Sequence, residues 1–160
     1  MPPIISIVGK SNSGKTTLIE KLVPELKQRG HRIGVIKHAL HGFNMDHEGK
    51  DSWRHKKAGA DTVIVAAPDG LAVMKTSGCD SLGKLLPFLE DVDLVITEGF
   101  KKDRYPKVEI VRAARTRQPL CRDDDTLVAF VTDTELDLNV PCFGLEDIPS
   151  LADLIVQRFL

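Results

Sequence analysis

A glycine-rich segment near the start of the chain has the residue types and the spacing of a phosphate-binding loop. Residues 9–17 read GKSNSGKTT and match the pattern G-x-x-x-x-G-K-[ST] at every required position. Backbone N–H groups can wrap a polyphosphate only where a loop is nearly free of bulky side chains. The segment is therefore predicted to bind phosphate through Gly9, Lys10, Ser11, Asn12, Ser13, Gly14, Lys15, Thr16 and Thr17.

Three residues of this loop have side chains with a distinct expected role. Lys15 is expected to neutralise the β and γ phosphates, which makes it a candidate catalytic residue, and the Thr16 hydroxyl to take one position on Mg²⁺. Lys10 resembles the lysine that, in a class of dimeric NTPases, reaches the partner subunit's nucleotide, whereas an exposed loop lysine is otherwise a solvated charge. The alternative for the whole segment is an ordinary strand-to-helix turn.

A second acidic element lies at residues 92–98, VDLVITE, an almost continuous apolar run that ends in Glu98. If this strand is buried on both faces beside the strand at 4–8, Glu98 comes near the metal at the carboxyl edge of the sheet. Glu98 would then hold a metal-bound water or orient the attacking one, as a metal-site and catalytic residue. A helix cap or a surface acid is the alternative.

Residues 37–60, KHALHGFNMDHEGKDSWRHKKAGA, form a polar loop with four of the five histidines. The loop begins at the carboxyl end of a predicted strand, where ligands bind in open α/β sheets, so a switch segment that closes over nucleotide is the functional interpretation. Asp46 or Asp51 could reach Mg²⁺ through water, and Asp46 is the metal-site candidate. Asp51 could instead only cap the helix that begins at DSWR.

The histidines of this loop have two further readings. Contacts with phosphate or substrate are expected of His38, His41 and His47. A transition-metal site of His41, His47 and His55 is disfavoured, because the spacing is irregular and no cysteine contributes.

The base of the nucleotide is not fixed by any common motif. The N-K-x-D element of many GTPases is absent, so GTP and ATP both remain open at this point. Asp133 follows the apolar run LVAFVT, where its carboxylate could accept from both guanine N1–H and the exocyclic amine. A turn-capping role is the alternative for Asp133.

Charged residues near the expected active edge offer weaker signals. The basic run 101–107 could bind a pterin phosphate or an acidic partner, or be a solvated loop. The run 122–125 is interpreted as a loop only. Arg112 and Arg115 are candidate phosphate partners without a geometry to test.

Apolar runs that alternate with helical patterns are expected to position these residues in an α/β fold with a mainly parallel sheet. An antiparallel hairpin around Pro68-Asp69-Gly70 would interrupt that sheet. The first helix should end at Gly30 and kink at Pro24. Strands are predicted at 4–8, 32–37, 61–67, 71–76, 93–98, 107–112, 127–131 and 140–144, and two later helices at 81–90 and 150–160.

Length and composition limit the class of protein. The 160 residues fit one domain, 1–160, and the net charge of −1 favours neither nucleic acid nor an anionic membrane as partner. The three cysteines form no C-x-x-C pair, and no segment reads as a signal peptide or membrane span. We therefore expect a cytoplasmic protein.

Four blocks of the sequence together resemble the molybdopterin-guanine dinucleotide biosynthesis protein B family: GKSNSGKTTL, the polar loop from Lys37, DLVITEGFK with PKVEIVR, and VAFVTD. The resemblance implies a three-layer P-loop NTPase fold and a homodimeric GTP-binding protein with weak GTPase activity and Mg²⁺. Its partner would be the guanylyltransferase that joins GMP to molybdopterin, with molybdopterin itself as a further ligand. It also implies that the histidine-rich loop lines the nucleotide cleft of the dimer.

Two other classes share the same phosphate loop. A small-molecule kinase would need a lid and an acceptor pocket, for which only the loop at 38–60 is a candidate. A metal-insertion GTPase for nickel enzymes would need a set of cysteine and histidine ligands that this sequence does not offer.

Overall fold

The structure, a computed structural model, describes residues 1–39, 42–76, 81–136 and 139–160. The chain forms two compact units: a core unit of Met1–His38 with Leu86–Leu160, and a hairpin unit of Ala39–Leu85. The expectation of a single domain is not tested by this division. None of the helices in the described part of the chain has the length and apolar character needed to cross a bilayer.

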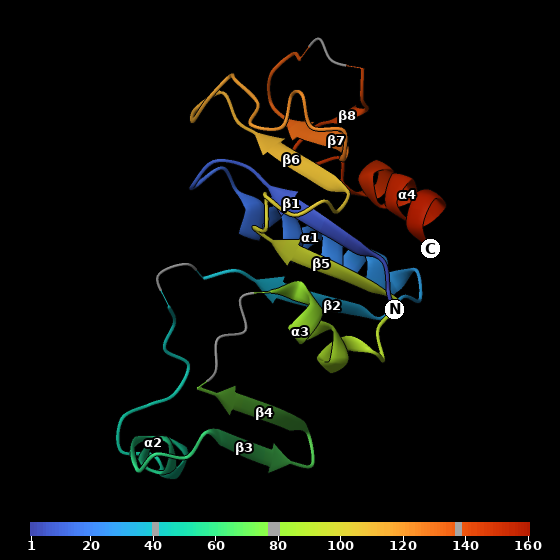
Figure 1. Ribbon diagram of the computed structural model, residues 1–160. Coiled ribbons are helices and arrows are strands. Elements are labelled where there is room, and N and C mark those ends of the chain that lie inside the picture. The colour runs from blue at the N-terminus through green and yellow to red at the C-terminus, as the bar shows by residue number, and fades with distance from the viewer. Residues whose placement is uncertain (40–41, 77–80, 137–138) are drawn as a thin grey trace. The chain divides into compact units, whose positions relative to one another are not determined.

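The core unit contains a six-stranded, entirely parallel sheet in the order β2-β5-β1-β6-β7-β8 (Figure 1). Its strands are β1 (Ile4–Val8), β2 (Ile33–Lys37), β5 (Leu94–Glu98), β6 (Lys107–Val111), β7 (Leu127–Thr132) and β8 (Cys142–Phe143). Apolar residues fill β1 and β5 almost without interruption, as expected of central strands covered on both faces. The predicted mainly parallel α/β architecture is confirmed.

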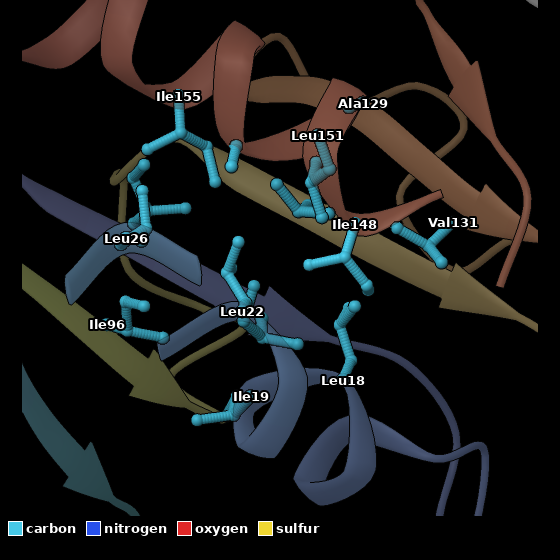
Figure 2. Packing of buried hydrophobic residues seen from close by; sticks show 14 of the residues in the cluster. Leu18, Ile19, Leu22, Leu26, Ile96, Ala129, Val131, Ile148, Leu151 and Ile155 are labelled. Atoms are coloured by element: carbon cyan, nitrogen blue, oxygen red, sulfur yellow. The ribbon is translucent and has the colours of Figure 1, made fainter. Parts of the chain in front are cut away.

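Two helices cover one face of this sheet, α1 (Lys15–Gln28) and α4 (Ile148–Phe159). Figure 2 shows their side chains meeting those of the strands in one hydrophobic cluster, with Leu18, Leu22 and Leu26 from α1 and Leu151 and Ile155 from α4. Leu22 and Leu26 are fully buried, so α1 is fixed along most of its length. The phosphate loop is thereby held between a rigid strand and a rigid helix.

The helix boundaries differ from the predicted ones for reasons of local chemistry. The closing helix begins at Ile148 rather than residue 150, because Pro149 is compatible with a first helical turn. The helix predicted at 81–90 is instead a short α3 (Leu82–Leu85) followed by the 3-10 helix η1 (Leu86–Leu89). Pro87 explains the change, since it has no N–H to donate within an α-helix.

The hairpin unit contains α2 (Asp51–Lys57) and the antiparallel strands β3 (Thr62–Ala67) and β4 (Gly70–Lys75). The hairpin was predicted, but the expectation that it interrupts the main sheet is wrong, because β3 and β4 form a separate two-stranded sheet. Ile64 pairs with Val73 and Ala66 with Leu71. Since alternate residues share a face, Ile64, Leu71 and Val73 form one apolar face, and all three are exposed in the described structure.

Candidate phosphate-binding site

The loop between β1 and α1 needs glycine at its first position. Gly9 has a φ of +147°, and a Cβ at this residue would lie 2.6 Å from the carbonyl oxygen of Ile110 in the neighbouring strand β6. Asn12 and Gly14 also have positive φ values, of 58° and 99°. The loop is thus pressed against β6 while it turns its backbone toward the start of α1.

Lys15, the first residue of α1, reaches back across this loop. Its Nζ donates to the carbonyl oxygens of Gly9 and Lys10, at 3.2 and 2.9 Å. Partial burial lowers the pKa of Lys15, while the Glu98 carboxylate acts in the opposite direction and Lys37 lowers it further. The ammonium group is therefore pre-positioned over the mouth of the loop.

Glu98 lies directly beside the start of α1. Strand β5 is paired with β1, with Glu98 opposite Ile7, and the Thr16 Oγ1 donates to both carboxylate oxygens of Glu98, at 3.2 and 3.3 Å. A hydroxyl and a carboxylate that meet in this way supply hard oxygen ligands of the kind that Mg²⁺ binds beside a phosphate. These two residues fit a magnesium ion.

Lys37 is a member of this site that the sequence did not single out. It ends β2 opposite Glu98, and its Nζ lies 3.7 Å from Glu98 Oε2. The signal was present, because Lys37 ends a predicted strand just as Glu98 does, and the carboxyl ends of parallel strands meet at one edge.

A cavity of about 460 Å³ opens over the loop. It contains one carboxylate and three cationic side chains, which suits a magnesium-bound polyphosphate. Its lining residues are Ser11, Asn12, Gly14, Lys15, Thr16, Thr17, Lys37, Glu98 and Arg112.

Three other residues predicted to bind nucleotide do not face the cavity in an obvious way. The Nζ of Lys10 donates to Thr116 Oγ1 at 3.2 Å, and the Ser13 hydroxyl is buried without a hydrogen-bond partner in the described structure. Asp133 accepts the backbone N–H of Ala113 at 2.7 Å. A role for Lys10 across a dimer and for Asp133 in guanine recognition both stay predictions.

The residues predicted in the polar loop are distributed over both units. His38 belongs to the core unit and stacks on Phe100, with ring centroids 4.4 Å apart, while His41 lies outside the described residues. Asp46 belongs to the hairpin unit, where its Oδ1 accepts from the His47 N–H and the Ser52 hydroxyl. Its role at the magnesium site stays a prediction.

The expectation that Asp51 caps α2 is wrong. Lys50 occupies the cap position, and Asp51 is the first helical residue, where its carboxylate lies 3.8 Å from Arg54 Nη1.

Two further features of the polar loop can be described. The ring of Trp53, in the same helix, has the Lys57 Nζ 4.4 Å from its centroid. Within the described ranges, no group of three or more histidine, cysteine or acidic residues could hold a metal ion.

The charged runs 101–107 and 122–125 are not simply solvated loops. Lys107 is buried, and its Nζ donates to Thr126 Oγ1 and the Asp103 carbonyl and lies 3.1 Å from Asp124. Arg104 and Asp125 also pair, at 2.7 Å. A cavity of about 940 Å³ lies along these runs, but its five cationic side chains are nearly balanced by four aspartates and no residue of the phosphate loop lines it, so its larger size does not make it the phosphate site.

Comparisons with known proteins agree with this architecture. The family model described as molybdopterin guanine dinucleotide synthesis protein B matches residues 4–133. A molybdopterin-guanine dinucleotide biosynthesis adapter protein of Haemophilus influenzae is 42% identical over 96% of this chain and 87% of its own length. The protein of the same name from Escherichia coli is 36% identical over 98% of this chain and 93% of its own length.

Solved structures give the same result for the fold. The crystal structure of Bacillus subtilis MobB superimposes with a TM-score of 0.76 and 32% identity, over 99% of this chain and 98% of that one. A crystal structure of molybdopterin-guanine biosynthesis protein B matches with the same TM-score and identity, over 98% of each chain. With its phosphate loop, its parallel sheet and these relatives, the chain belongs to the molybdopterin guanine dinucleotide synthesis protein B (MobB) family.

Proposed function

We propose that this protein is a cytoplasmic, GTP-binding adapter in the synthesis of molybdopterin guanine dinucleotide, with Mg²⁺ as its metal and with weak GTPase activity. It would assist the guanylyltransferase that joins GMP to molybdopterin. The contact between Thr16 and Glu98 at the mouth of the phosphate loop carries the nucleotide part of the proposal. Family membership and the adapter names of the curated relatives support the pathway.

Different residues of the site would bind different parts of a magnesium-bound triphosphate. The loop amides would bind the β-phosphate, and the Lys15 ammonium, which here donates to the carbonyls of Gly9 and Lys10, would turn to neutralise the β and γ oxygens. Thr16 and Glu98 would hold a magnesium ion, which when bound would offset negative charge on the phosphate oxygens. Glu98 would also be the candidate to orient the attacking water.

Slow turnover follows from the side chains at the cavity. Among the described residues that line it there is no glutamine to position a water. A water-positioning glutamine and an arginine at the γ-phosphate supply factors of about 10³ to 10⁵ in related reactions, so a site without such a glutamine is expected to hydrolyse GTP slowly. A slow GTPase suits a protein that presents nucleotide, or a nucleotide-dependent surface, to a partner enzyme.

We also propose that the protein is a homodimer and that the dimer binds the partner enzyme. The exposed apolar face of the hairpin, formed by Ile64, Leu71 and Val73, supports a homodimer, because such a face is costly to leave in water. Molybdopterin is proposed as a ligand of the assembled complex.

Calorimetry with Mg²⁺-GTP tests the nucleotide part. The wild-type protein should bind GTP, Lys15→Ala should lose detectable binding, and Lys27→Ala, an exposed lysine at the other end of α1, should bind like the wild type. Unchanged affinity in Lys15→Ala would refute the site. A pull-down tests the pathway. The wild-type protein is used as bait with and without GTP, and the captured proteins are identified by mass spectrometry. Failure to enrich the guanylyltransferase over a Lys15→Ala bait would count against the proposed partner.

A further inference from the structure

Resting on the GTP site proposed above, we propose that Arg112 binds the nucleotide at its α-phosphate, and that Asp133 positions Arg112 instead of reading the guanine base. Arg112 is the first residue after β6, and Asp133 is the first residue after β7. These two strands are neighbours in the sheet, so their carboxyl ends bring the two side chains together at the edge that carries the phosphate loop.

Two cavities meet at Arg112. The first, of about 460 Å³, contains Lys15, Thr16 and Glu98, where the γ-phosphate and magnesium would lie. The second, of about 100 Å³, shares only Gly14, Thr17 and Arg112 with the first. Its other lining residues are Ser13, Leu18, Lys21, Ile110, Leu145 and Glu146.

The positions of the two cavities suggest how the nucleotide lies. A triphosphate with its γ-phosphate near Glu98 would extend past the first turn of α1. The second cavity lies beside this turn, where Thr17 and Leu18 line it. Loop amides of this kind bind the α and β phosphates, and the lysine the β and γ phosphates. Arg112, at the junction of the two cavities and on the side away from Glu98, therefore faces the α-phosphate.

The conformation of Arg112 fits an anion at this place. Its stem lies along Gly14, since a Cβ there would be 3.8 Å from Arg112 Cδ and 3.9 Å from Nη1. Its Nε is buried and has no hydrogen-bond partner in the described structure, while the side chain as a whole is 43% exposed. A buried N–H of a charged group is costly when it lacks an acceptor, and phosphate oxygens match the planar fork of arginine.

Asp133 is oriented toward the same turn. Its Oδ1 accepts from the N–H of Ala113 at 2.7 Å, and its Oδ2 lies 3.8 Å from Arg112 Nε, an ion-pair distance that is too long for a hydrogen bond. A carboxylate that reads guanine must offer both oxygens to N1–H and the exocyclic amine. In this structure both oxygens of Asp133 face residues 112–113 instead.

Calorimetry on three arginine variants tests the role of Arg112. Arg112→Met keeps the apolar stem and should lower the affinity for Mg²⁺-GTP and for GDP by the same factor, about 10- to 100-fold for a charged hydrogen bond. Arg112→Lys keeps the charge without the fork and should recover part of this loss. Arg158→Met, at an exposed arginine in the last turn of α4 that lines neither cavity, should change affinity by less than about twofold.

Each contrary result has a distinct meaning. Unchanged affinity in Arg112→Met overturns the proposal, and so does a loss confined to GTP, which would place the guanidinium at the γ-phosphate. A wild-type protein that does not bind GTP refutes the proposed function itself. Thermal melts of all variants verify folding, and Arg112→Lys keeps the test valid if the methionine variant is unstable.

Xanthosine triphosphate separates the two roles of Asp133. Xanthine carries a carbonyl in place of the guanine amine, so an asparagine at a base-reading position would gain a hydrogen bond to XTP. We expect Asp133→Asn to lower the affinities for GTP and XTP by the same factor, because the variant loses the ion pair that positions Arg112. A preference for XTP over GTP in this variant would show that Asp133 reads the base and would overturn its positioning role.

Discussion

Thr16 and Glu98 are 82 positions apart in the sequence, yet the Thr16 hydroxyl donates to both oxygens of the Glu98 carboxylate. The contact joins the first turn of α1 to the carboxyl end of β5. It exists because β5 is inserted beside β1 in the sheet, with Glu98 opposite Ile7. The strand order thus assembles the candidate magnesium site from two distant segments.

The first prediction concerns the magnesium dependence of nucleotide binding. Glu98→Gln keeps the shape of the side chain but removes the negative charge that holds a divalent cation. In the wild type, Mg²⁺ should strengthen GTP binding relative to EDTA, and in Glu98→Gln most of this gain should be lost while affinity in EDTA stays the same or rises. Calorimetry in both buffers measures the effect, and an equal magnesium gain in the two proteins would contradict the assignment.

The second prediction concerns the packing of the phosphate loop on β6. Gly9→Ala would place a methyl group 2.6 Å from the Ile110 carbonyl oxygen, at a φ that L-residues rarely adopt. We expect the free energy of unfolding to fall by about 1–3 kcal/mol and GTP affinity to fall with it. Gly30→Ala is the control, since Gly30 also has a positive φ but nothing within 4 Å of the added methyl. Chemical denaturation should show a smaller loss there and calorimetry no change in GTP affinity; equal effects in both variants would disprove the role of the clash.

The third prediction uses the pH dependence of stability at Asp124. Hydrogen bonds from the Thr126 hydroxyl and backbone N–H, together with Lys107, lower the pKa of Asp124 from its ordinary 3.8 to about 2. Between these values the folded protein binds fewer protons than the unfolded chain, so this contribution to stability is present above pH 3.8 and is lost as the pH falls toward 2.

Asp124→Asn should therefore be less stable than the wild type at neutral pH, and the difference should shrink as the pH falls through this interval. Denaturant titrations from pH 6 downward measure it. The neighbouring exposed Asp123→Asn provides the control and should differ little from the wild type throughout. A difference for Asp124→Asn that is constant with pH would exclude the ionised contact as its source.

The fourth prediction concerns self-association through the hairpin. Leu71 is 69% exposed and Ile64 60% exposed on one face of the β3–β4 sheet. Introducing charge there, as Ile64→Lys with Leu71→Lys, should convert the homodimer proposed above into a monomer, because burial of an unpaired ammonium is unfavourable. Light scattering after gel filtration measures the mass. Val35→Lys, at an exposed apolar position in β2 (47% exposed), should leave the mass unchanged, and a persistent dimer in the double variant would place the interface elsewhere.

Local patterns were sufficient to predict most elements of the core unit. Continuous apolar runs predicted β1 and β5 because these strands are covered on both faces, and the helical spacing of Leu18, Leu22 and Leu26 predicted the buried side of α1. The single helix predicted at 81–90 was wrong in detail, because Pro87 lacks the N–H that would continue an α-helix and the chain there forms a 3-10 turn. The hairpin was identified from its turn residues, but its membership of a separate sheet depends on pairing that no turn encodes.

Charged residues were harder to interpret, because their partners are distant in sequence. Lys107 reads as part of a solvated basic run, yet its buried Nζ contacts Asp124 and Thr126. Asp133 and Ala113 show the same difficulty, since their contact depends on β6 and β7 being neighbours.

The sequence by itself determined the phosphate loop, the α/β class and the family, because each depends on residue types at short, fixed spacings. Only the tertiary structure decided which side chains meet at the mouth of that loop. Lys37, Glu98 and Arg112 come from the ends of three different strands, β2, β5 and β6, and reach one cavity because of the order of those strands in the sheet. That order is set by long-range backbone pairing and burial, which act between segments and leave no short pattern in any one of them.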